Sequence, residues 1–371
     1  MFEQESGAKA GGKGKRQEHM KRQFQAQRQF RNAGGKWRQQ FGLPLICTFL
    51  LFLGSCTTDP PEQTDPTTPV PALPELPATP LFDPDSSYSF VQAQVDFGPR
   101  IPGTASHKAC GDWMVSRLKG SGATVIEQTG NVLSFNGERL PLRNIIGSWN
   151  LDRQERILLF AHWDTRPFAD RDTERKNEPI DGANDGGSGV GILLEIARHL
   201  AAKEHGPGVD ILFTDVEDHG EPSGAMTIDE NSMDTWCLGS RYWARNPHVP
   251  GYTARFGILL DMAGAREAKF YQEALSMQYA PGIVRKVWKT AAALGYGDRF
   301  IQETKYFVGI DDHIPVNQTL RIPSIDIIEY DPSTQAFGPY WHTHKDNMEV
   351  IDPATLKAVG QTVMEVVWKE R

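Results

Sequence analysis

The chain has 371 residues, of which 39% are hydrophobic and 10% aromatic, and a formal net charge of −8. This is enough for a large hydrophobic core in one or two domains. Residues 1–55 carry ten of the 39 Lys and Arg but only three of the 47 acids, so the remainder has a net charge of −15. Such a charge argues against nucleic acid as a partner and favours cationic or neutral substrates.

The N-terminal segment has the composition of an export signal. A basic flank, residues 1–40, precedes 13 apolar residues, Phe41–Leu53. This order is typical of a secretory signal, and the apolar stretch is too short to span a membrane. Residues 53–56 (LGSC) resemble a bacterial lipobox, in which the cysteine, here Cys56, is lipidated. The alternatives are an ordinary signal peptide with an incidental cysteine, or a buried core segment.

A proline-rich stretch after Cys56 favours the lipoprotein interpretation. Thr57–Pro80 has eight prolines in 24 residues and is expected to form an extended spacer. We therefore predict a signal peptide in residues 1–55 and a lipidated Cys56 with a spacer in residues 56–80. The catalytic domain is predicted in residues 81–371. The protein would be exported and lipid-anchored to a bacterial membrane, on its periplasmic or cell-surface face.

From residue 81 onward, helical and strand-like segments alternate, which predicts a single α/β domain with a mostly parallel mixed sheet flanked by helices. The first strand is expected at Arg143–Trp149. A final helix is expected to begin at Asp352-Pro353, an N-cap residue followed by proline. Helices are also expected at Ala105–Leu118, Ser188–Ala202 and Pro281–Leu294.

Four apolar runs each end on a residue that binds metal or moves protons. Continuous Val, Ile, Leu and Phe runs are typical of strands that are buried on both faces. Ligands bind beyond the carboxyl ends of such strands, so we expect one active site along this edge. The runs are Arg156–His162, Val209–Asp215, Phe256–Asp261 and Ile325–Glu329.

The first two candidate motifs are weak when taken alone. His162 and Asp164 are spaced to point to the same face of a strand, where Asp164 would orient the imidazole. A capped strand with a satisfied buried histidine explains the pair equally well. Asp185 lies in a glycine-rich stretch, residues 181–189, which lacks the spacing and the lysine of a phosphate-binding loop. An ordinary loop aspartate is the alternative to a metal ligand there.

Glu217 and Asp218 give a sharper signal. Two adjacent acids at a buried strand end are costly unless a cation compensates them, although a solvated turn is the alternative. One imidazole and two carboxylates form a common three-ligand zinc set with an open fourth position, and His342 in the loop after the last strand offers the imidazole. His344 is expected beside the ligands or in solvent.

Taken together, the segments HWD, NDGGSG, DVED, LLD, DDHIP and WHT resemble the zinc-dependent aminopeptidase-like family, and within it the bacterial type of glutaminyl cyclase. The resemblance covers most of residues 100–352. It implies one zinc per chain, bound by Asp185, Asp218 and His342, with Glu217 as general acid and base. It further implies a carboxylate network of Asp261 and Asp311 and a substrate pocket walled by Trp341 and Asp326.

Two positions depart from the animal enzymes of this family. Asp218 stands where those enzymes have glutamate, and Asp326 stands where they have a pocket histidine. The implied activity is conversion of N-terminal Gln of peptides and proteins to pyroglutamate with release of ammonia.

A di-zinc aminopeptidase of the same superfamily remains an alternative, because His162 and Asp261 could hold a second metal with Asp185 bridging. A lipid-anchored binding protein on an inactive scaffold is a third possibility, against which the complete set of ligand and acid–base residues argues. Cys110 and Cys237 could form a disulfide, which an oxidising compartment permits, or remain free thiols.

Overall fold

The structure is a computed structural model that describes residues 78–202, 206–222 and 235–370, within the compact unit Leu73–Arg371. The predicted signal peptide, Cys56 and nearly all of the predicted spacer lie outside these residues. No helix in the described ranges is long and apolar enough to cross a membrane.

The central element is a six-stranded mixed sheet of order β1-β2-β4-β3-β5-β8. The pairs β1–β2 and β2–β4 are antiparallel, whereas β4–β3, β3–β5 and β5–β8 are parallel. The predicted α/β fold with a mostly parallel mixed sheet is thereby confirmed. The strands of this sheet are β1 (Thr124–Leu133), β2 (Arg139–Trp149), β3 (Arg156–His162), β4 (Gly208–Thr214), β5 (Phe256–Asp261) and β8 (Ser324–Ile328).

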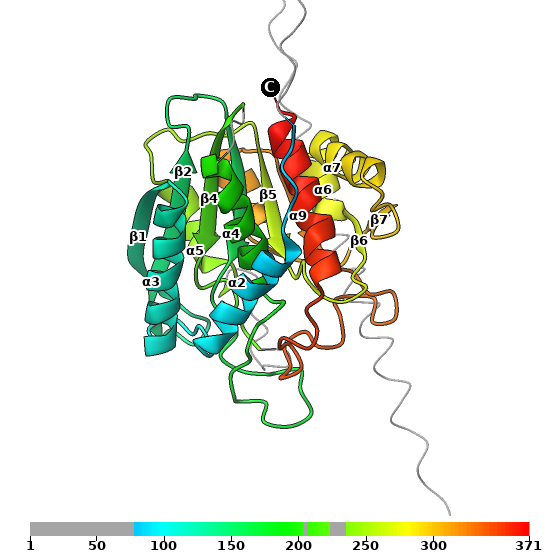
Figure 1. Ribbon diagram of the computed structural model, residues 1–371. Helices are drawn as coiled ribbons and strands as arrows, with labels where there is room; N and C mark the ends of the chain where they lie inside the picture. The colour runs from blue at the N-terminus through cyan, green and yellow to red at the C-terminus, as the bar shows by residue number, and fades with distance from the viewer. Residues whose placement is uncertain (1–77, 203–205, 223–234, 371) are drawn as a thin grey trace, which may run out of the picture. The chain divides into compact units, whose positions relative to one another are not determined.

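Helices cover both faces of the sheet, and Figure 1 shows α3, α4 and α9 on the face toward the viewer. A separate pair of parallel strands, β6 and β7, lies beside α6 and α7. The remaining elements are α2 (Pro84–Asp96), α3 (Ala105–Gly120), α4 (Gly187–Ala202), α5 (Leu238–Arg245), β6 (Phe270–Glu273), α6 (Ala274–Tyr279), α7 (Pro281–Ala293), β7 (Phe300–Lys305), α8 (His313–Pro315), the π-helical turn η2 (Val316–Leu320) and α9 (Pro353–Trp368).

Strand β3 shows why the central strands are apolar throughout. Its residues Ile157, Leu159 and Ala161 belong to the larger core cluster, which includes side chains of α3, α4 and α9. Leu158 and Phe160 point to the other face, into a core shared with α5 and η2. Because both faces are covered, the strand has no polar face until it ends at His162, as expected for a buried parallel strand.

Most predicted elements occur near their predicted bounds. Strands β3 and β5 have the predicted limits, and β4 and β8 begin and end one residue earlier than predicted. Asp352 caps α9 as predicted, since its side chain accepts hydrogen bonds from the backbone N–H groups of Ala354 and Thr355. Cys110 and Cys237 are both free and buried, so the disulfide alternative is wrong.

Candidate active site

The polar ends of the central strands meet at one edge of the sheet. The register pairs His162 of β3 with Thr214 of β4 and Asp261 of β5 with Ile328 of β8, so these strands end side by side. Glu217 and Asp218 follow directly after β4. Figure 1 shows the loop after β3 and the loop after β8 at this same end of the sheet. The candidate residues that end or follow these strands therefore lie at one edge of the sheet.

Backbone strain accompanies this edge. Val216, Met262 and His342 have positive φ angles of 53°, 43° and 56°. A β-branched residue such as Val216 rarely adopts this conformation. Strain of this kind concentrates at functional sites, where the surrounding structure holds it in place. Here it lies directly before Glu217, directly after Asp261 and at His342 itself.

Asp185, Asp218 and His342 form a buried cluster. One potential ligand atom of each lies within 4.8 Å of those of the other two. His342 Nε2 is 3.2 Å from Asp218 Oδ1 and 3.7 Å from Asp185 Oδ2. The three side chains come from three loops far apart in the sequence, and the fold brings them together. We call this cluster the His342 triad.

A second cluster shares Asp185 with the first. His162 Nε2 is 3.0 Å from Asp185 Oδ1 and 3.2 Å from Asp261 Oδ1, and these three residues also meet the distance criterion for a shared ion. We call this cluster the His162 triad. The ligands that a second metal would need are thus assembled as well.

The His342 triad fits a zinc ion. The Oδ2 atoms of Asp185 and Asp218 are buried and have no hydrogen-bond partner among the described residues, which is costly for carboxylates. Burial and the nearby Asp218 carboxylate raise the pKa of Asp185 to about 6. A divalent cation would relieve both penalties, and two carboxylates with one imidazole are ligands that zinc accepts.

Asp185 is positioned by the backbone around it. The Asp346 carboxylate accepts hydrogen bonds from the backbone N–H groups of Asn184 (2.8 Å) and Asp185 (3.1 Å). The loop also passes very close to β3, since a Cβ added at Gly186 would lie 2.3 Å from the carbonyl oxygen of His162. Only glycine permits this approach, which explains the glycines that follow Asp185.

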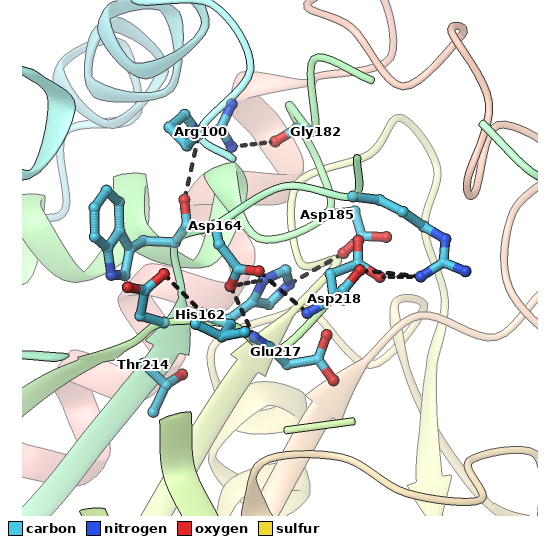
Figure 2. A network of polar contacts seen from close by, with 12 residues as sticks. Arg100, His162, Asp164, Gly182, Asp185, Thr214, Glu217 and Asp218 are labelled. Carbon is cyan, nitrogen blue, oxygen red and sulfur yellow. Dashed lines mark hydrogen bonds and ion pairs between the residues drawn. The ribbon is translucent and has the colours of Figure 1, made fainter. Parts of the chain in front are cut away.

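Asp164 organises the segment after β4. Its two carboxylate oxygens accept hydrogen bonds from the backbone N–H groups of Glu217 (3.0 Å) and Asp218 (3.2 Å). Its Oδ1 also lies 3.6 Å from His162 Nδ1. Figure 2 shows Asp164 beside His162, with dashed contacts to His162 and to the segment that carries Glu217. Asp164 therefore lies close to the imidazole it was predicted to orient, and it also fixes the turn that presents both acids.

Glu217 retains partial solvent exposure. Burial, together with the carboxylates of Asp218, Asp312 and Asp311, raises its pKa well above the usual range. The thiol of Cys237 donates a hydrogen bond to Glu217 Oε1 at 3.2 Å. A glutamate whose pKa is raised is suited to accept and return a proton.

The remaining acids form a buried group beside Glu217. Burial and the charge of Asp261 raise the pKa of Asp311 well above its usual value, and burial with the charge of Asp311 does the same for Asp326. One carboxylate oxygen of each lies within 4.8 Å of one of the other. Asp326 is 0% exposed, so its side chain lies beside Asp311 without meeting solvent, rather than on an open pocket wall.

Aromatic rings surround His342. The Trp341 ring is 4.1 Å from the imidazole and packs edge-on against Phe337 at 4.5 Å. The Trp236 ring stacks parallel to the imidazole at 6.0 Å. His344 points elsewhere, with its Nδ1 2.8 Å from Asp172 Oδ2, and it is absent from the metal-binding clusters found among the described residues.

Several residues at the site carry no sequence signal that we could identify. Arg166, Asp170, Cys237 and Trp236 contact the predicted residues only through the tertiary fold. Asp346 lies shortly after the WHT segment in the sequence. Its role as an acceptor for the backbone at Asp185 required the structure.

The sequence and the fold are similar to those of known zinc peptidases and glutaminyl cyclases. The model of peptidase family M28 matches residues 144–367. The crystal structure of Bacteroides thetaiotaomicron glutaminyl cyclase bound to N-acetylhistamine is 50% identical, with a TM-score of 0.77, and the match covers 79% of this chain and 100% of that one. A Zn-dependent exopeptidase from Parabacteroides distasonis is 51% identical, with a TM-score of 0.76 and the same two coverages.

Curated proteins are more distant. Aminopeptidase YwaD of Bacillus subtilis is 25% identical over 61% of this chain, and this chain spans only 44% of the length of YwaD. The glutaminyl-peptide cyclotransferase of Drosophila melanogaster is also 25% identical, over 69% of this chain and 73% of that protein. Both enzyme types expected from the sequence thus occur among the relatives.

Proposed function

The chain belongs to peptidase family M28. Within this family, we propose that it is a glutaminyl cyclase, a glutaminyl-peptide cyclotransferase. It converts the N-terminal Gln of peptides and proteins to pyroglutamate and releases ammonia. The observation that carries this conclusion is 50% identity over the whole of the Bacteroides thetaiotaomicron glutaminyl cyclase chain. The acids and the imidazole at one edge of the sheet are consistent with this chemistry.

The reaction is an intramolecular acyl transfer. The α-amino nitrogen of the substrate attacks its own γ-amide carbon, the new N–C bond closes a five-membered lactam, and the C–N bond to the amide nitrogen breaks. Because both reacting groups belong to one residue, the enzyme mainly has to hold them in a reactive geometry. The Trp341 ring, which packs between Phe337 and His342, is suited to help hold the substrate in this geometry.

Glu217 is the proposed proton carrier. Its carboxylate takes a proton from the attacking amine and delivers it to the departing nitrogen, which leaves as ammonia. Its position directly after β4 and next to Asp218 supports this role, and so does the upward shift of its pKa, which strengthens it as a base. Asp261 and Asp311 are proposed to hold this proton path in place.

The substrate pocket is proposed to lie beside Trp341. Its ring stands between Phe337 and His342 and offers an apolar wall for the glutamine side chain. Asp326, predicted as part of the same wall, would act from behind through its charge beside Asp311.

Asp185, Asp218 and His342 would hold one zinc ion per chain, which when bound supplies Lewis-acid polarisation of the γ-carbonyl. The unpaired, buried Oδ2 atoms of Asp185 and Asp218 support this assignment. The other described cluster that includes Asp185, the His162 triad, is proposed to remain without metal and to keep Asp185 oriented.

A di-zinc aminopeptidase is the second candidate, and two observations favour it. The His162 triad is assembled, and one relative of similar identity is described as a Zn-dependent exopeptidase. In that case Glu217 would activate water and the peptide bond after the first residue would be hydrolysed. Metal content separates the candidates, since one zinc per chain supports the cyclase and two support the peptidase.

The direct test uses the purified chain without residues 1–77 and two substrates. A Gln-peptide should lose the mass of one ammonia, and ammonia should be released at the same rate. A reporter that detects removal of an N-terminal residue should remain intact. Loss of the N-terminal residue instead of ammonia would contradict the cyclase assignment. A metal chelator should abolish the observed activity, because both candidate activities depend on zinc.

We also propose that the protein is exported and anchored to a bacterial membrane through a lipid on Cys56. The support is the apolar stretch Phe41–Leu53, residues 53–56 and the proline-rich spacer after them. Cys56→Ala should abolish incorporation of a labelled fatty acid and release the protein from the membrane fraction. A variant that remains labelled and membrane-bound would contradict this proposal.

A further inference from the structure

Arg166 is a fully buried cation next to the His342 triad. Its side chain is 0% exposed. One face of its guanidinium lies 4.5 Å from the Phe168 ring, and it lies 4.7 Å from the Trp236 ring. A buried arginine is costly unless its donors are used, and its partners therefore indicate its role.

Those partners lead to Asp218. Arg166 Nη1 donates to the backbone carbonyl oxygen of Asp218 at 3.0 Å and lies 3.4 Å from its Oδ1 atom. The same nitrogen reaches the carbonyl oxygen of Gly220 at 3.4 Å. The guanidinium thus contacts both the backbone and the carboxylate of one proposed zinc ligand.

The other side of the guanidinium leads to His342 through Asp170. Arg166 Nε donates to Asp170 Oδ1 at 2.7 Å, and the same oxygen lies 3.3 Å from His342 Nδ1. His342 Nε2 is the nitrogen that faces Asp185 and Asp218. The contact of Asp170 with Nδ1 is at an ion-pair distance, since Nδ1 has no hydrogen-bond partner among the described residues. A carboxylate this close favours a proton on Nδ1, which leaves the Nε2 lone pair free for a metal.

We propose that Arg166 and Asp170 form one positioning unit that orients two of the three zinc ligands, Asp218 directly and His342 through its Nδ1 atom. This inference rests on the proposed zinc site, and it concerns the ligands rather than the reacting atoms. The planar, fixed fork of arginine can address two partners at once, which lysine cannot reproduce. The rings of Phe168 and Trp236 shield the contacts from water, which strengthens them.

The same loop contains a matched comparison. Asp172 lies two residues after Asp170 and also pairs with a histidine, since its Oδ2 atom is 2.8 Å from His344 Nδ1. Neither Asp172 nor His344 belongs to a metal-binding cluster among the described residues. If aspartate–histidine pairing merely stabilises this loop, loss of either pair should have the same effect. If Asp170 positions a ligand, only its loss should weaken zinc binding.

The test compares Asp170→Asn with Asp172→Asn in the purified chain. Zinc affinity is measured by competition with a chromophoric chelator, without any substrate. The visible spectrum of the cobalt-loaded protein reports on the geometry of the ligands. We expect Asp170→Asn to bind zinc about 10–100-fold more weakly with an altered cobalt spectrum, and Asp172→Asn to match the wild type. Equal affinities for Asp170→Asn and wild type, or equal losses in the two variants, would overturn the proposal.

Arg166→Lys provides a second variant that retains the buried charge. We expect it to weaken zinc binding as well, because one ammonium cannot contact Asp218 and Asp170 together. An affinity equal to that of the wild type would contradict the role given to Arg166. Thermal unfolding of the zinc-free proteins shows which variants are folded, and only folded variants are compared for zinc affinity.

The affinity measurement and the activity measurement fail independently. A wild-type protein that binds zinc but releases no ammonia from Gln-peptides contradicts the proposed function. The positioning unit is then still tested by the zinc affinities of the variants. An active wild type with unchanged affinity in Asp170→Asn contradicts the positioning unit alone.

Discussion

The two histidines at the site are held in different ways. His162 is the last residue of β3, a central strand paired on both sides, and the sheet register fixes its position. His342 lies in the loop after β8, with a positive φ of 56°. Its position depends on side-chain contacts with Asp170, Trp236 and Trp341.

This difference divides the site into a part held by strands and a part held by a loop. Glu217 and Asp261 follow or end strands, whereas His342 is positioned by residues that the sheet does not hold. A strand end tolerates loss of one contact because its backbone pairing remains. We therefore expect zinc binding to respond mainly to changes around His342, and proton transfer to changes around Glu217.

The largest expected effect separates the two histidines. His342→Ala should lose zinc and with it all zinc-dependent ammonia release, because it removes the only imidazole of the His342 triad. His162→Ala should retain one zinc per chain, since His162 is proposed to bind no metal. Elemental analysis of both dialysed proteins measures this. Loss of metal in His162→Ala with retention in His342→Ala would reverse the assignment.

Glu217→Gln should act on the chemistry without acting on the metal. Removing a general acid–base group typically lowers kcat by about 10²–10⁴, while zinc content should stay at one per chain because Asp218 is unchanged. Ammonia release and metal analysis on the same preparation measure both. Glu221→Gln, four residues further along, is the control and should retain wild-type activity. Near-normal activity of Glu217→Gln would show that another group carries the proton.

The loop that carries His342 should respond to pH through Glu329. Glu329 accepts hydrogen bonds from the backbone N–H of Gly338 (2.8 Å) and from the Tyr340 hydroxyl. Burial raises its pKa from 4.5 to about 7. Between these two pKa values the folded state keeps a proton on Glu329 that the unfolded state releases. The contribution of Glu329 to the free energy of unfolding is therefore fully present below pH 4.5 and is lost as the pH rises through about 7.

Glu329→Gln should remove this dependence. The difference in unfolding free energy between wild type and variant should change by up to about 3 kcal/mol across this window. Urea unfolding of both zinc-free proteins from pH 4.5 to pH 8 measures it. Parallel stability curves for the two proteins would contradict the raised pKa.

Cys237→Ala should have the smallest effect. It removes the thiol contact to Glu217 Oε1, and a hydrogen bond worth about 1 kcal/mol corresponds to roughly a five-fold decrease in kcat. Zinc affinity should not change. Cys110→Ala is the matched control, because Cys110 is also a buried free thiol but lies in α3. Equal effects of the two substitutions would point to packing rather than to Glu217.

The sequence predicted the strand-held part of this site better than the loop-held part. The continuous apolar runs of β3 and β5 mark buried strands, and their last residues, His162 and Asp261, follow from the same pattern. Strand β1 was not predicted. It lies at the sheet edge, and its exposed and half-buried positions give it a polar composition that resembles a loop.

The contacts around His342 have no local pattern from which to predict them. Arg166 and Asp170 are two charged residues in a polar loop, which is usually a solvated segment. Their burial depends on Phe168 and Trp236 and on a turn after another strand. Asp326 was predictable in part. Its place near the site follows from its position in β8, whereas its burial beside Asp311, without solvent contact, depends on tertiary packing.

The most direct test of the central claim is an anomalous difference map, collected at the zinc absorption edge from crystals of the zinc-loaded protein. We expect one peak per chain, bounded by Asp185, Asp218 and His342. Two peaks per chain, or one peak between His162, Asp185 and Asp261, would contradict this claim.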